Sequence, residues 1–222
     1  MIRKTVFQHP STGLLAGLLL SGLLAVSPAA SAQEADAGAF IQNLESQAMQ
    51  VLRPSVPTEH RSAAFRQLLA RDFDMTGLTR FVLGPNARGL SPEQQQEFTV
   101  LLRDNMAEAY STKLSQYAGE PFRVTGTRPM GGETVVASQV ERRSGQPVEI
   151  DWHVVNHDGH FLVTDVAVDG VSQKLTQRNE FAGIVQRNGG RPEALIAALR
   201  QQLQQKPATR MEPSYGSSVP AR

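Results

Sequence analysis

Four short segments of alternating apolar and polar residues lie between residues 122 and 168, and they constrain the fold of this 222-residue chain more than any other feature. The separators are turn-forming sequences: Met130-Gly131-Gly132, Ser144-Gly145-Gln146 and His157-Asp158-Gly159. Connections this short join antiparallel strands, because parallel strands need long crossovers. We therefore predict about four antiparallel strands, at residues 122–127, 134–142, 148–155 and 161–168.

A two-residue loop at Asp158-Gly159 would set the pairing of the last two strands. The pairs are then His157 with His160, Val155 with Leu162, and Trp152 with Asp165. One face is predicted to be apolar, with Asp165 among Val148, Ile150, Trp152, Val154, Phe161, Val163 and Ala167. The other face would carry Glu149, Asp151, His153, Leu162, Thr164, Val166 and Val168.

Helical spacing of apolar residues precedes and follows these strands. The predicted helices cover residues 39–53, a segment capped by Thr58, 75–83, 91–117, 173–188 and a segment from 192 to about 203. The clearest start is Ser91-Pro92, with Gln94 placed for a capping box. An apolar stripe on the long helix, which includes Met106, Tyr110, Leu114 and Tyr117, is expected to face the sheet. The fold class is therefore α+β.

The two ends of the chain differ from the predicted domain, which covers residues 33–204. Arg3 and Lys4, an apolar run over residues 14–26 and Ala30-Ser31-Ala32 predict a cleavable signal peptide at 1–32, although an uncleaved anchor is an alternative. Residues 205–222, rich in Pro, Ser and Gly, predict a disordered tail. Without the signal peptide, 20 basic residues face 21 acidic ones, which argues against a nucleic-acid partner. The chain has no cysteine, which excludes disulfides, thiolate metal sites and a lipid-modified cysteine anchor.

Chemistry-bearing residues are few. His153, His157 and His160, with Asp158 between them, could hold a metal, but they fit a solvent-exposed turn better, so no metal or other cofactor is predicted. Asp165 on an apolar face could act as a general acid or base, although it has no identifiable catalytic partner. The alternative is that it pairs with an arginine or accepts backbone N–H groups where strand meets helix. Ser172 is expected to cap the following helix, and Arg178 and Glu180 to form surface ion pairs.

Several stretches together resemble one family. They are FRQLLARDFDMTGLTRFVLG, LSPEQQQEF and, most specifically, DVAVDGVSQKLTQRNEF, which ends at Phe181. Over residues 40–203 the chain is similar to the MlaC-like, or toluene-tolerance, periplasmic phospholipid-binding proteins, and in detail to their hopanoid-associated HpnM branch. One departure is that the aromatic residues common in the family are missing near Asn86-Ala87, where Arg88 is the match to a Trp-Arg pair.

The resemblance implies a curved antiparallel sheet and several helices that enclose a deep apolar pocket for lipid chains. It implies a monomeric, non-enzymatic carrier of phospholipid or hopanoid, which maintains outer-membrane lipid asymmetry. The implied partners are an outer-membrane lipoprotein complex and an inner-membrane ABC transporter with an MCE component. Asp165, Gly170 and Arg178 are expected to hold the junction between the last strand and the helix after it. The expected lipid-binding residues are Phe73, Leu78, Val82, Phe98, Leu102, Met106, Tyr110, Leu114, Val136, Val140, Ile150, Trp152, Val154, Val166, Val168 and Val171.

Two alternatives to the carrier stay open on the sequence. One is an enzyme that uses Asp165 on a lipid or isoprenoid substrate. The other is a ligand-free adaptor of a lipid transporter, whose pocket would be filled by Trp152, Tyr110 and Phe98.

Overall fold

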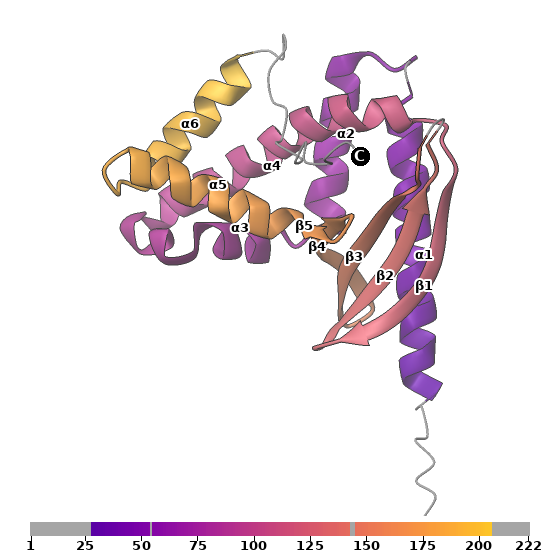
Figure 1. Ribbon diagram of the computed structural model, residues 1–222. Coiled ribbons are helices and arrows are strands. Elements are labelled where there is room, and N and C mark those ends of the chain that lie inside the picture. The colour runs from indigo at the N-terminus through magenta and orange to yellow at the C-terminus, as the bar shows by residue number, and fades with distance from the viewer. Residues whose placement is uncertain (1–27, 54, 143–144, 206–222) are drawn as a thin grey trace, which may run out of the picture.

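The computed structural model describes residues 28–53, 55–142 and 145–205. In it a group of helices lies to one side of a curved sheet, and the first helix runs along the sheet (Figure 1). The predicted α+β class is confirmed. The helices are α1 (Pro28–Val51), α2 (Thr58–Asp72), α3 (Met75–Leu83), α4 (Pro92–Leu114), α5 (Gln173–Arg187) and α6 (Glu193–Gln204), with 3-10 turns η1 (Gly84–Gly89) and η2 (Ser115–Tyr117).

The sheet is antiparallel throughout, and its strands follow one another in chain order. The strands are β1 (Phe122–Met130), β2 (Glu133–Val140), β3 (Val148–His157), β4 (His160–Val168) and β5 (Val171–Ser172). The four predicted strands are all present, and the two-residue β5 was missed. It forms because Asp169 and Gly170, both with positive φ, turn the chain back onto β4.

A β-bulge in β4 corrects the predicted register. The turn at Asp158-Gly159 pairs His157 with His160 and Val155 with Leu162, as expected. Beyond Val154 the pairing shifts by one residue, so that Trp152 lies opposite Val166 and His153 lies opposite Asp165. A one-residue shift exchanges the two faces of a strand. Val166 and Val168 therefore lie on the apolar face, and Asp165 and Ala167 lie on the polar face, the reverse of the prediction.

The helix boundaries differ from the prediction in three places. Helix α1 begins at Pro28, not at residue 39, because the Ala, Gln and Glu residues before Phe40 favour a helix without adding an apolar stripe. The expected cap at Thr58 is wrong: Pro57 precedes the helix, and the Thr58 hydroxyl accepts a hydrogen bond from Arg61. Helix α4 ends at Leu114 and continues as a 3-10 turn. Its start is as predicted, since Ser91 and Gln94 form both hydrogen bonds of the capping box.

The buried core joins the helices to one part of the sheet. Phe98 of α4 is fully buried and meets Phe181 of α5 edge to face, with ring centroids 5.5 Å apart. Helix α1 lies against β1, and Phe40 stacks on Phe161 of β4. From the sheet, Val136, Val154 and Val163 enter this core, each no more than 1% exposed.

The predicted signal peptide and tail lie outside the described residues, except for residues 28–32, which begin α1, and Gln205. Within the described part of the chain, no helix combines the length and the apolar character that crossing a bilayer requires.

Candidate functional site

The apolar face of the sheet, which we call the inner face, carries a row of mainly apolar side chains across all five strands. The pairing places Val124, Ser138, Ile150, Val168 and Val171 side by side, one from each strand. Exposure rises along this row from Ser138, which is 2% exposed, through the half-buried Ile150 and Val168 to Val171, which is 47% exposed. The apolar face is thus covered in its middle and uncovered toward β5.

The sixteen residues predicted to bind lipid fall into three groups. The first group is fully buried in the core: Val82, Phe98, Leu102, Val136 and Val154. The second group is half-buried and packs on the core from outside: Phe73, Leu78, Met106, Tyr110, Leu114, Trp152 and Val166. The third group belongs to the sheet and does not pack on the core: Val140, Ile150, Val168 and Val171. We call this third group the open strip.

The open strip has no evident role in holding the described fold together. Ile150, Val168 and Val171 are direct cross-strand neighbours, and Val140 lies diagonal to Ile150. Three are half-buried and Val171 is exposed. Apolar side chains that lie together outside the core make this strip a candidate surface for an apolar ligand.

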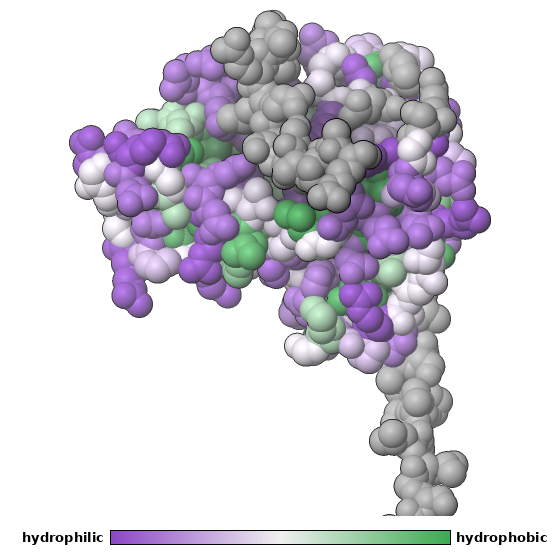
Figure 2. Space-filling view, viewed as in Figure 1, coloured by the Kyte–Doolittle hydropathy of each residue, from purple (hydrophilic) through white to green (hydrophobic). Residues whose placement is uncertain are grey.

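On the helical side, α4 does not lie on the sheet as predicted. It packs mainly against α2 and α6, while α5, α3 and α2 make the helical contacts with β4. Met106, Tyr110 and Leu114 are half-buried on the core surface of α4. Figure 2 shows hydrophobic surface in the region between the α3–α6 helices and the sheet.

Two polar groups of the inner face, the Trp152 indole N–H and the Ser138 hydroxyl, are held in internal hydrogen bonds. The Trp152 indole N–H donates to the Ser138 hydroxyl at 2.9 Å, and that hydroxyl donates to the Ile150 carbonyl at 3.1 Å. The indole therefore presents its apolar ring without an unsatisfied donor, as a surface for acyl chains requires.

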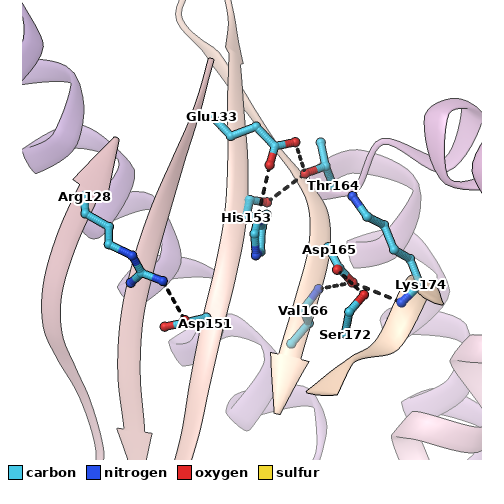
Figure 3. A network of polar contacts seen from close by, with 9 residues as sticks. All are labelled: Arg128, Glu133, Asp151, His153, Thr164, Asp165, Val166, Ser172 and Lys174. Carbon is cyan, nitrogen blue, oxygen red and sulfur yellow. Dashed lines mark hydrogen bonds and ion pairs between the residues drawn. The ribbon is translucent and has the colours of Figure 1, made fainter. Parts of the chain in front are cut away.

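The opposite face of the sheet is polar, and Asp165 belongs to it (Figure 3). The residue is 6% exposed, and its carboxylate accepts hydrogen bonds from the amides of Val166 (2.8 Å) and Lys174 (3.0 Å) and from the Ser172 hydroxyl (2.5 Å). The Ser172 hydroxyl also accepts from the Leu175 amide at 3.2 Å, which confirms it as the cap of α5. Asp165 is thus a structural acceptor where strand meets helix, one of the two roles expected for it.

Arg178 lies elsewhere than predicted. Its guanidinium is over the Phe81 ring of α3, 5.2 Å from the centroid, and not at the junction with Asp165. Gly170, with φ of +79°, is in the β4–β5 turn. Glu180 accepts a hydrogen bond from Gln177 at 3.2 Å. The surface ion pairs expected for Arg178 and Glu180 are therefore not the contacts that these side chains make.

Glu133, His153 and Thr164 form a second cluster on the polar face (Figure 3). The Glu133 carboxylate is 3.0 Å from His153 Nδ1 and accepts a hydrogen bond from Thr164 at 2.8 Å. Burial would raise the pKa of Glu133, but these hydrogen bonds and the charges of Lys174 and His153 outweigh it and lower that pKa. The cluster joins β2, β3 and the bulge of β4, so it stabilises the shifted register.

The Glu133 cluster gives a pH prediction. Because the pKa is lower in the folded chain, the cluster stabilises the fold at neutral pH and this stabilisation is lost as pH falls through the folded pKa. Glu133→Gln should therefore lower the urea midpoint at pH 7, and the difference from wild type should shrink at pH 3. Glu149→Gln, an exposed change on β3, serves as the control. A difference in urea midpoint between wild type and Glu133→Gln that grows as the pH falls would contradict this assignment.

The histidines do not come together as a metal site. His153 is held by Glu133, while His157 and His160 are exposed at the β3–β4 turn. Among the described residues, no three His, Asp or Glu side chains are grouped to hold a metal ion.

A hollow of about 290 Å³ lies between α1, α2 and the β3–β4 turn. Its walls include Phe40, Arg71, Asp72 and Phe161. Arg71 is already bonded to Asp72 and to Gln47. Drug-sized ligands occupy roughly 300–1,000 Å³, so the hollow is small for a two-chain lipid.

Sequence reasoning missed two features that shape this region. The bulge at Thr164 leaves no pattern in an alternating segment, because each residue remains compatible with either face. Phe81, which holds Lys174 and Arg178, looks like any other apolar residue of α3. Its contact depends on how α3 and α5 pack, which the helical period of one segment does not reveal.

This chain is similar to known proteins in both sequence and fold. The family model described as "MlaC protein" matches residues 42–201. A relative, "Toluene tolerance protein ttg2D" of Pseudomonas putida, is 24% identical over 128 residues, which are 57% of this chain and 60% of the relative. A phospholipid-binding protein of Ralstonia solanacearum, solved in complex with a phospholipid, is similar in fold, with a TM-score of 0.65 and 21% identity over 77% of this chain and 98% of that one. The match of the family model over most of the chain shows that this protein belongs to the MlaC family.

Proposed function

We propose that this protein is a periplasmic lipid carrier that binds a phospholipid by its acyl chains and moves it between the outer and inner membranes. The observation that carries the proposal is the open strip, a run of apolar side chains that the core does not use. Membership of the MlaC family and the fold shared with a phospholipid-binding protein support it.

The free-energy cost of exposing acyl chains to water explains why a lipid carrier needs an apolar surface outside its core. Two acyl chains contain about 30 methylenes, so exposing them to water costs on the order of 25 kcal/mol at about 0.8 kcal/mol each. In this proposal the chains lie along the open strip and against Trp152 and Val166. The half-buried side chains Met106, Tyr110 and Leu114 of α4 supply further apolar surface on the helical side. Partner proteins that separate the sheet from the helices would load and unload the lipid, since release of the acyl chains into water would be slow.

The proposal includes no chemical step. Asp165 accepts three hydrogen bonds on the polar face, away from the open strip, so it has no role toward a lipid lying there. The proposed partners are an inner-membrane transporter with an MCE component and an outer-membrane lipoprotein complex. Export would use residues 1–32 as a cleavable signal peptide, and the carrier would act as a monomer.

Native mass spectrometry of the protein purified from its own periplasm tests this function. A one-to-one glycerophospholipid adduct on a chain that lacks residues 1–32 is the expected result. A hopanoid adduct would keep the carrier mechanism and change its cargo. A protein that stays empty and takes up no lipid from liposomes would overturn the proposal and favour a ligand-free adaptor.

A further inference from the structure

Two cations of α5 lie over one aromatic ring of α3. Lys174 Nζ is 5.1 Å and the Arg178 guanidinium carbon is 5.2 Å from the centroid of Phe81. Residues four apart share a helix face, with about 5–6 Å between their Cβ atoms. The ring attracts each cation and fixes the end of a side chain that would otherwise be mobile.

These two cations lack the carboxylate partners that several other surface arginines of the fold have. Arg123, Arg128 and Arg200 each pair with a carboxylate. Within the described ranges, no carboxylate lies within 4.0 Å of Lys174 Nζ or the Arg178 guanidinium, and neither group donates a hydrogen bond. Both side chains are half-buried, and like charges at this spacing repel each other. An anion between them would remove the repulsion and accept their N–H groups.

The position of Arg178 is further restricted by Gly84. A Cβ atom at residue 84 would come within 3.1 Å of the Arg178 guanidinium, so a side chain at position 84 would crowd the arginine. Gly84 has φ of +50°, which also favours glycine. The chain thus holds the guanidinium in place without using its donors.

Two carboxylates lie in the same region, and both are engaged. Asp165 accepts the Lys174 amide as well as the Val166 amide and the Ser172 hydroxyl. Glu133 bonds to His153 and Thr164, and Lys174 acts on it at longer range. The backbone amide of Lys174 is therefore taken, and an incoming anion would meet the two side chains.

The open strip ends a few residues before this pair in the sequence. Val171, the last residue of the strip, is three residues before Lys174 and is 47% exposed. Leu175, directly after Lys174, is 49% exposed. An amphiphile with chains on the strip would bring a charged group to the first two turns of α5.

We infer that Lys174 and Arg178, held over Phe81, form a binding site for a phosphate group. A guanidinium and an ammonium that both lie within about 5 Å of one ring centre suit phosphate oxygens, which take charge-assisted hydrogen bonds from both kinds of group. The phosphate belongs either to a lipid headgroup or to a free phosphate ion. The lipid source rests on the proposed function, whereas the phosphate ion does not.

The test compares the double variant Lys174→Gln/Arg178→Gln with Arg187→Gln, an exposed position on the same helix. Delipidated protein is mixed with vesicles that contain phosphatidylglycerol or diacylglycerol with the same chains. Wild type should prefer phosphatidylglycerol, and the double variant should lose about tenfold in its uptake while diacylglycerol uptake is unchanged, since a charged hydrogen bond contributes about that factor. Arg187→Gln should behave as wild type.

In the second arm, inorganic phosphate is titrated into each protein and followed through the amide NMR signal of Leu175. A dissociation constant raised about tenfold or more in the double variant alone supports the site. Lys174→Arg/Arg178→Lys, which keeps both charges, should restore binding in whichever arm responds, and circular dichroism checks that each variant folds.

The two arms separate the sources. A lipid effect identifies the headgroup, and a response to inorganic phosphate alone identifies the free ion. If wild type takes up no lipid, the proposed function fails while the phosphate arm still decides this site. If the double variant matches wild type in both arms, the inference is overturned.

Discussion

Asp165→Ala should lower the free energy of unfolding by about 3 kcal/mol. Asp165 is 6% exposed and its carboxylate accepts three hydrogen bonds, so the change leaves two backbone amides and the Ser172 hydroxyl without an acceptor. Each unsatisfied buried donor costs about 1–3 kcal/mol, and partial access of water to the β4–β5 turn reduces the total. Urea unfolding of the lipid-free protein measures the effect.

The matched control for this prediction is Asp151→Ala. Asp151 lies on the same polar face and pairs with Arg128 at 2.8 Å, but the two side chains are 36% and 51% exposed. Exposed ion pairs contribute about 0–1 kcal/mol, so this variant should be nearly as stable as wild type. Equal losses in the two variants would mean that Asp165 is not the structural acceptor described above.

Asp165→Asn separates the structural role from a chemical one. The amide keeps one acceptor oxygen in place of two, so its stability should lie between wild type and Asp165→Ala. Full lipid loading and full cellular function in this variant would dismiss an enzyme that depends on the Asp165 carboxylate.

The overall fold was predictable because its signals are local. Each predicted strand rests on alternation, and each connection rests on a glycine turn such as Asp158-Gly159. The start of α4 rests on side chains that bond to their own helix end, as Ser91 and Gln94 do. Such signals act within a few residues, so they predict the local structure regardless of how distant segments pack.

The predictions that failed depend on contacts between distant segments. The bulge at Thr164 exchanged the faces of Asp165 and Val166, and the bulge is held by Glu133 from another strand. Arg178 pairs with the ring of Phe81, almost a hundred residues earlier, because α3 and α5 pack together. Neither partner could be chosen from local spacing.

The candidate site shows the same division. Periodicity identifies apolar residues but does not separate those that fill the core, such as Phe98 and Val136, from those that stay outside it, such as Ile150 and Val168. That distinction requires the register of the sheet and the placement of α1 and α2 over part of it.

Ile150→Glu should remove lipid binding while the protein still folds. Ile150 is half-buried, lies in the middle of the open strip between Ser138 and Val168, and does not pack on the core. A carboxylate there would have to be buried against acyl chains or hold them away, and an unpaired buried charge is costly enough to outweigh several methylene contacts. We expect the lipid-bound fraction in native mass spectrometry to fall at least about tenfold, with a loss of stability of about 1 kcal/mol or less, as is usual away from the core.

Val155→Glu is the matched control for this change. Val155 is on the same strand and also half-buried, but it lies opposite Leu162 on the polar face. The same new charge should leave the lipid-bound fraction close to that of wild type, because water and the polar groups of that face can solvate it. If Ile150→Glu kept its lipid while Val155→Glu lost it, the acyl chains would have to be assigned to the other face. If both variants kept it, the open strip would not be the lipid surface, and the apolar side chains of α4 would remain as the place to test next.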